Sequence, residues 1–204
     1  MAEPSQLLAE VETTPRARLI DALASSIEEK GYRDTTVADI VRIAKTSRRT
    51  FYEHFADRGE CFLALFERLT NDKMQQIADA VDPELPLEEQ IERAIDVYIE
   101  GIVADPELQR SFVRELPALN EASAEALRMT LERYAGMLTG LVGAARERHP
   151  EVHLQPLSHD VALILVGGLR ELMVISIQQG RDLHELRDSS LAVVKALLMS
   201  LKSD

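Results

Sequence analysis

Residues 31–58 read GYRDTTVADIVRIAKTSRRTFYEHFADR, and the predicted architecture follows from the spacing within this stretch. Two short helices are predicted, one opened by Thr36 and the other by Ser47, because Ser and Thr are preferred helix N-caps. Phe51 and Phe55 are four residues apart, so they share one face of the second helix and fix it to its neighbours. Two short helices joined by a tight turn indicate a helix-turn-helix.

The polar side chains of the second short helix have chemistry that suits double-stranded DNA. Arg48, Arg49, Thr50, Tyr52 and His54 are expected to point sideways or outward, away from the phenylalanine face. Arginine can bond bidentately to guanine, threonine offers a hydroxyl and a methyl group, and tyrosine can donate to phosphate. The helix N-terminus adds free N–H groups and a positive dipole end.

The charge distribution supports this interpretation better than the net charge of −12 does. Residues 16–60 hold nine Lys and Arg against eight Asp and Glu, whereas residues 61–204 carry a net charge of −10. Residues 42–49 contain four cations and no anion. Such asymmetry indicates a small end that faces a polyanion, on an acidic body. Judged by charge alone, a solvated helix face is the alternative.

From Arg18 to Leu65, the chain closely resembles the N-terminal module of the TetR family of transcriptional regulators. The resemblance rests on Gly31-Tyr32, Thr35-Thr36-Val37-Ala38-Asp39-Ile40, Ala44, Ser47-Arg48-Arg49-Thr50-Phe51-Tyr52, His54-Phe55 and Arg58. It implies a DNA-binding surface formed by Thr36, Lys45, Thr46, Ser47, Arg48, Arg49, Thr50, Tyr52, His54 and Arg58. Within this set, Thr36 would cap the first short helix and touch phosphate, and His54 and Arg58 would hold the DNA backbone.

The turn departs from the family pattern, which commonly has Gly-Val where this chain has Lys45-Thr46. A lysine in that position is expected to adopt left-handed backbone geometry, at a cost of about 1 kcal/mol. It would also add a cation near the phosphates.

The rest of the chain is helical in its periodicity. A first helix is expected from Pro15 to Gly31, and a longer one after Asp57. Pro83 and Pro86 mark a break. Further helices are predicted near 87–104, 106–116, 121–148, 157–179 and 182–202. The predicted fold is all-α with about nine helices, comprising a helix-turn-helix DNA-binding domain over 12–72 and a helical effector-binding and dimerisation domain over 73–204.

The family resemblance implies that the C-terminal part dimerises and binds a small effector. The helix near 157–179 is apolar almost all round, and Gly167-Gly168 permits close approach of another backbone. Pairing of the helices near 157–179 and 182–202 with their symmetry mates would form a homodimer. Packing of both within one monomer's core is the alternative. The candidate ligand-binding residues are Tyr98, Phe112, Arg114, Met129, Tyr134, Met137, Arg170 and Met173, with Arg110 a further candidate partner for an acidic group.

Several other classes of protein are disfavoured. The longest uncharged apolar run, 161–169, is about half a membrane span. Cys61 is the single cysteine, and Pro150 separates His149 from His153, so no metal site is expected. The N-terminal residues contain no apolar stretch typical of a secretory signal, and together with the lone cysteine this indicates a cytoplasmic protein. No catalytic cluster or cofactor motif is evident, so we expect a non-enzyme without cofactors. We expect a ligand-responsive homodimeric repressor of a near-palindromic operator. The alternatives are an effector-independent DNA-binding protein and a helical protein-interaction scaffold.

Overall fold

The computed structural model describes residues 14–200, apart from the side chains of Val152, Leu198 and Met199. Within that range the regular structure is entirely helical, with nine α-helices and two short 3-10 helices, and this confirms the all-α prediction. The chain divides into two compact units after Leu65. Both this division and the predicted boundary after residue 72 fall inside one long helix, and residues 12 and 13 of the predicted first domain lie outside the described range.

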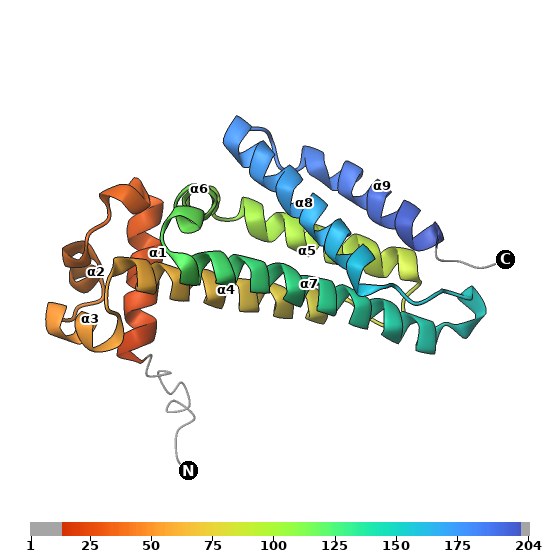
Figure 1. The fold of residues 1–204 in the computed structure, drawn as a ribbon, viewed down its shortest axis with the longest axis horizontal. Helices are drawn as coiled ribbons and strands as arrows, with labels where there is room; N and C mark the ends of the chain where they lie inside the picture. Colours follow the sequence, from red (N-terminus) through yellow and green to blue (C-terminus); the bar gives the residue numbers. More distant parts are fainter. Residues whose placement is uncertain (1–13, 201–204) are drawn as a thin grey trace, which may run out of the picture. The chain divides into compact units, whose positions relative to one another are not determined.

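The first unit contains α1 (Pro15–Asp34), α2 (Val37–Ile43), α3 (Arg48–His54) and the start of α4 (Arg58–Ala80) (Figure 1). The Thr14 side chain caps α1 by accepting from the Ala17 N–H at 3.2 Å, and Pro15 follows as its first residue. Gly31 has φ 79° and interrupts the helical backbone near the end of α1. The regular part of the helix therefore ends at Gly31, where the end was predicted, and one further turn leads to α2.

The core of the first unit includes the two phenylalanines that were predicted to face inward. Phe51 is 0% exposed and Phe55 is 1% exposed, with ring centroids 5.6 Å apart. Tyr32 stacks on Phe62 at 4.1 Å. Cys61 is fully buried and packs as a small hydrophobic residue. The other large apolar side chains that are fully buried in the described part of this unit are Leu19, Ile20, Leu23, Ile27, Ile40 and Leu65.

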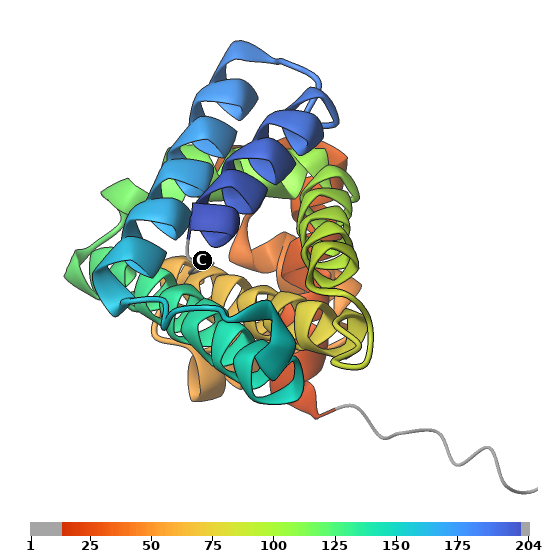
Figure 2. The ribbon, with the colours of Figure 1, turned by 90° about the vertical axis from the view of Figure 1, so that its right-hand side faces the viewer.

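The second unit is a helical bundle. It contains the remainder of α4, α5 (Leu87–Val103), α6 (Pro106–Glu115), η1 (Leu116–Ala118), α7 (Glu121–Arg148), η2 (Pro150–Val152), α8 (His159–Gln179) and α9 (Glu185–Ser200). Figure 2 shows α8 and α9 lying side by side, with α5 next to α9 and α7 next to α8. Its core cluster combines residues of α5, α7, α8 and α9, including Ile95, Ala135, Leu165 and Val194.

Small differences from the predicted boundaries have local causes. α8 begins at His159 rather than 157 because Ser158 caps it, its hydroxyl accepting from the Val161 N–H at 3.3 Å. α9 begins at Glu185 because residues 182–184 form a hydrogen-bonded turn, and residues 201–202 of the predicted helix lie outside the described range. The two 3-10 helices were not predicted. In the part of the chain that is described, no helix is long and apolar enough to cross a membrane.

The burial of Phe51 predicts a large effect on stability. Phe51→Ala should lower the free energy of unfolding by about 3–5 kcal/mol, because the lost contacts leave a cavity in a packed core. Urea denaturation followed by far-UV circular dichroism measures this change. The neighbouring Tyr52 is 58% exposed, so Tyr52→Ala should stay within roughly 0.5 kcal/mol of the parent. Equal effects of the two substitutions would contradict the packing described here.

Candidate nucleic-acid interface and ligand cavity

The turn between α2 and α3 is a Schellman motif centred on Lys45. The Thr46 N–H donates to the Val41 carbonyl at 2.9 Å, and the Lys45 N–H donates to the Arg42 carbonyl at 3.3 Å. These bonds require a left-handed residue between them, and Lys45 has φ 51°. The predicted left-handed lysine is therefore confirmed. Lys45 is exposed and lies two residues before Ser47, the N-cap of α3.

Side-chain caps fix the start of each short helix. Ser47 accepts from the Thr50 N–H at 3.1 Å and opens α3. Thr36 opens α2 through a capping box, in which its hydroxyl accepts from the Asp39 N–H at 3.3 Å and the Asp39 carboxylate accepts from the Thr36 N–H at 2.9 Å. The Lys30 ammonium, 2.8 Å from Asp39, and the Thr36 donors hold the pKa of this carboxyl well below its usual range. The Thr36 hydroxyl also donates to Asp39 at 2.6 Å, so a contact with phosphate would compete with that bond.

The polar residues of α3 are accessible to a partner. The Arg49 side chain is 90% exposed, and Arg48 and Tyr52 are exposed as well. Arg49 Nε lies 3.1 Å from Glu53 one turn later. Exposed pairs of this kind contribute only about 0.3–0.5 kcal/mol, so a DNA base or phosphate can displace Glu53. Thr46, Thr50 and His54 are half-buried.

Arg58 has a structural role that the sequence did not reveal. Its guanidinium donates to the carbonyl oxygens of Tyr32, at 3.0 Å, and of Thr35, and it lies 4.2 Å from the centre of the Tyr32 ring. These carbonyls lie around the connection from α1 to α2, where the helix has ended and oxygens need other donors. Arg58 thus ties the start of α4 to that connection. Contact with the DNA backbone remains a prediction for this residue.

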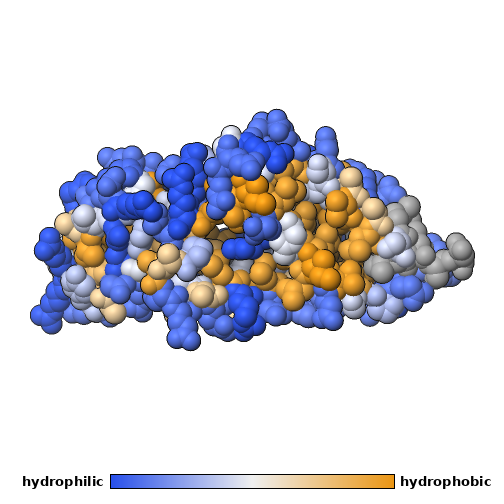
Figure 3. Space-filling model, turned by 45° about the horizontal axis from the view of Figure 1, so that its top comes forward, coloured by the Kyte–Doolittle hydropathy of each residue, from blue (hydrophilic) through white to orange (hydrophobic). Residues whose placement is uncertain are grey.

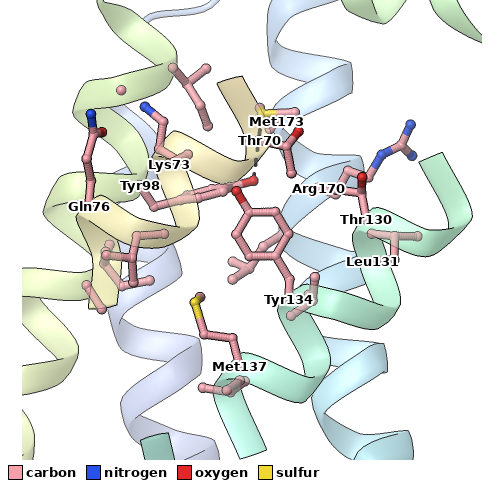
Figure 4. Close-up of a pocket in the computed structure, with 18 of the residues that line it drawn as sticks. Thr70, Lys73, Gln76, Tyr98, Thr130, Leu131, Tyr134, Met137, Arg170 and Met173 are labelled. Atoms are coloured by element: carbon pink, nitrogen blue, oxygen red, sulfur yellow. Dashed lines mark hydrogen bonds between the residues drawn. The ribbon is translucent and has the colours of Figure 1, made fainter. Parts of the chain in front are cut away.

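The second unit contains a mainly apolar cavity of about 440 Å³, a size typical of sites for small organic molecules (Figure 4). Of the residues predicted to bind a ligand, Tyr98, Phe112, Tyr134, Met137, Arg170 and Met173 line it. The predictions for Arg114 and Met129 are corrected, because neither lies in the cavity wall. Arg114 is exposed, and Met129 is 44% exposed beside Arg128. Arg110 is also outside the wall and pairs with Glu107 at 3.0 Å.

Lys73 is a cavity residue that sequence reasoning missed. It is half-buried, and burial lowers the pKa of its ammonium, with Asp105 acting in the opposite direction. Its Nζ lies 1.1 Å from the point that a Cβ on Gly101 would occupy. A lysine on the middle of α4 shows no distinctive sequence signal, because the cavity depends on how several helices pack.

His149, one of the two histidines considered for metal binding, and His159 at the start of α8 both have other partners. His149 Nε2 lies 3.1 Å from the Pro83 carbonyl oxygen, and His159 Nε2 lies 2.8 Å from Glu132. Within the described residues, no group of three His, Cys, Asp or Glu side chains is placed to hold a metal ion.

The geometry of the first unit defines a helix-turn-helix protein, with a capped second helix whose aromatic face is buried and whose cationic face is exposed. Residues 19–65 match the family described as bacterial regulatory proteins, tetR family. The match lies within the part of the chain whose sequence resembles this family and leaves residues 66–204 outside it.

Curated relatives match over the N-terminal part. The uncharacterized HTH-type transcriptional regulator YhgD of Bacillus subtilis is 28% identical over 82 residues, 40% of this chain and 43% of YhgD. The HTH-type transcriptional regulator TtgR of Pseudomonas putida is 32% identical over 74 residues, 35% of each chain. The matched segment thus spans less than half of the length of these relatives.

Solved structures match over nearly the whole chain. The fatty acid degradation regulator FadR of Bacillus halodurans is similar with a TM-score of 0.70 and 20% identity, covering 87% of this chain and 93% of FadR. FadR of Bacillus subtilis, solved in complex with stearoyl-CoA, has a TM-score of 0.68 and 21% identity, covering 86% and 95%. At this identity the likeness establishes the fold, in both its N-terminal and C-terminal parts.

The left-handed lysine predicts a gain in stability on substitution by glycine. Lys45→Gly should raise the free energy of unfolding by roughly 0.5–1 kcal/mol, because glycine adopts positive φ without strain and part of that gain is offset by its flexibility in the unfolded chain. Chemical denaturation measures the change. Lys45→Ala is the matched control, since it removes the same charge and keeps the Cβ. A similar gain for alanine would show that charge, rather than backbone strain, is responsible.

Proposed function

We propose that this protein is a homodimeric, ligand-responsive transcriptional regulator, acting as a repressor, that binds a near-palindromic operator through α3 of each protomer. The observation that carries the proposal is the exposed cationic face of α3 on a helix locked from behind by Phe51 and Phe55. A recognition helix must present its side chains without collapsing onto its own domain, and this arrangement meets that requirement.

The polar residues of the module divide into two kinds of contact. Arg48, Arg49 and Thr50 lie on the first turn of α3, from which side chains reach base edges in a major groove. Lys45 and the free N–H groups at the start of α3 suit neighbouring phosphates. Tyr52 follows further along α3, where its hydroxyl can donate to phosphate.

Homodimerisation is supported by the outer faces of α8 and α9. Both helices give one face to the core of their own unit, yet Ile164 is 75% exposed, Val193 is 55% exposed and Ile175 is 38% exposed. Figure 3 shows apolar residues gathered over the face that carries these helices. A Cβ on Gly167 or Gly168 would meet no atom of the described residues within 4 Å. The space beside these glycines is thus open to another molecule, and a second copy would offer a self-complementary surface.

An effector role for the cavity is supported by its size and apolar wall. By analogy with the similarly folded FadR that was solved with stearoyl-CoA, a ligand in the C-terminal unit would favour one arrangement of the paired α3 helices over another. Such a response requires different affinities for two states, typically worth about 1–3 kcal/mol. An effector-independent DNA-binding protein or a protein-interaction scaffold would not need this cavity.

Replacement of Arg49 tests the recognition surface. Arg49→Ala should weaken binding to the operator by about 1–3 kcal/mol and reduce discrimination between bases, because an arginine that reads a base edge contributes specificity as well as charge. The operator is first selected from genomic fragments bound by the parent protein, and fluorescence anisotropy then measures affinity. Arg128→Ala, an exposed and ion-paired arginine on α7, is the matched control. Parental binding by the Arg49 variant would contradict the assigned surface.

Replacement of Ile164 tests the dimer. Ile164→Asp should convert the dimer to monomer at micromolar concentration, because burial of an unpaired carboxylate in an apolar interface is unfavourable. Light scattering after size-exclusion chromatography measures the mass. Tyr52→Asp places the same charge on another exposed large side chain and should leave the dimer intact. A parent protein that is monomeric, or an Ile164 variant that remains dimeric, would contradict pairing through α8.

A further inference from the structure

Two tyrosine hydroxyl groups meet inside the cavity. Tyr98 comes from α5 and Tyr134 from α7, and their rings pack edge to face with centroids 6.2 Å apart. Figure 4 shows the two hydroxyl groups pointing toward one another within the space that the cavity residues enclose. Two separate helices thus contribute a pair of hydroxyl groups to a mainly apolar wall.

Among the described residues, neither hydroxyl has an oxygen acceptor. Tyr98 Oη donates to Met173 Sδ at 3.8 Å, and a thioether is a weak acceptor. In the same part of the chain, no hydrogen bond engages the Tyr134 hydroxyl. Buried phenol groups usually find a hydrogen-bond partner. The pair is therefore a preformed donor site whose acceptor must come from something that enters the cavity.

The environment of the pair favours a neutral acceptor over an ionised one. Burial raises the pKa of Tyr98 to about 12, which outweighs the opposite effect of Arg170, and burial also raises the pKa of Tyr134. Both groups consequently remain protonated donors at neutral pH. A carboxylate placed here would lose its hydration in exchange for two neutral donors and the charge of Arg170, which Glu171 opposes, whereas a carbonyl oxygen needs no counter-ion.

The charged groups of the cavity are already opposed by other charges. Arg170 Nη1 lies 3.9 Å from Glu171. The negative charge of Asp105 acts on the Lys73 ammonium and favours its charged form. Asp72 also lines the cavity, so the charged side chains that the described wall contains, two cations and two anions, sum to zero. The wall as a whole therefore does not select an anion.

We propose that the cavity binds a mainly apolar molecule with one neutral carbonyl group, such as a ketone, ester or lactone, whose oxygen accepts hydrogen bonds from Tyr98 and Tyr134. This inference deepens the proposed function and rests on the cavity being the effector site. It assigns the remaining cavity to the hydrocarbon part of the ligand, in contact with side chains such as Met137, Leu138 and Ile95.

A displacement experiment on the full chain tests the ligand class. The fluorescent apolar probe N-phenyl-1-naphthylamine is bound to the protein and displaced with 2-undecanone or with undecanoate, which have the same number of carbons. We expect 2-undecanone to bind several-fold more tightly than undecanoate. Tyr98→Phe and Tyr134→Phe should each weaken 2-undecanone binding by about fivefold, the effect of one lost hydrogen bond, and leave undecanoate binding nearly unchanged.

Two controls separate the tyrosine pair from other causes. Tyr52→Phe makes the same chemical change on the exposed surface of α3 and should leave ketone binding at the parental value. Lys73→Gln removes the cavity's ammonium and should also leave it unchanged. Tighter binding of undecanoate, parental ketone binding by both cavity variants, or no ketone binding up to its solubility limit would overturn the proposal.

The same preparations distinguish this inference from the proposed function. Operator binding is measured with and without saturating 2-undecanone. A ketone that binds through the tyrosines without changing operator affinity leaves the ligand class standing and argues against the effector role. Conversely, operator release by undecanoate that depends on Lys73 supports the effector role and overturns the neutral carbonyl.

Discussion

The packing of Phe51 and Phe55 into the first unit is the constraint on which the DNA-binding geometry depends. Both rings are essentially fully buried, and α3 is only seven residues long. A helix this short is not stable alone, so its position comes from tertiary contacts. Because the aromatic side chains fix its rotation about its own axis, the direction in which Arg48 and Arg49 point is set by the core. Folding and presentation of the cationic surface are therefore one event.

The sequence predicted local structure well because local structure has local causes. Thr36 and Ser47 cap the helices they were expected to cap, and Gly31 and Gly180 adopt positive φ where α1 loses its regular form and α8 ends. The left-handed residue at position 45 was predicted from the family resemblance, because the family pattern commonly has glycine there and glycine adopts positive φ readily. In each of these cases the determining atoms lie within a few residues of one another.

Features that depend on distant residues were not predictable. The bonds from Arg58 to carbonyl oxygens of the α1–α2 connection join residues far apart in the chain. Arg58, which was expected to contact a DNA phosphate, therefore has an additional role within the protein. In the cavity, Tyr98 and Tyr134 were identified from residue type, but Lys73 was not, and Arg114 and Met129 were placed wrongly. Helical periodicity tells which face is apolar. It does not tell whether that face meets a neighbour, a ligand or solvent.

Gly101 has a consequence for the shape of the cavity. Because glycine has no side chain, there is space beside α5 at this position, and the ammonium group of Lys73 occupies it. Any larger residue at position 101 would displace the ammonium end of Lys73, and this flexible side chain can move away without disturbing the fold. The tip would then have to settle in the cavity or in solvent. A single methyl group at position 101 would thus change the volume that is open to small molecules, while the residues of α3 would keep their positions in the first unit.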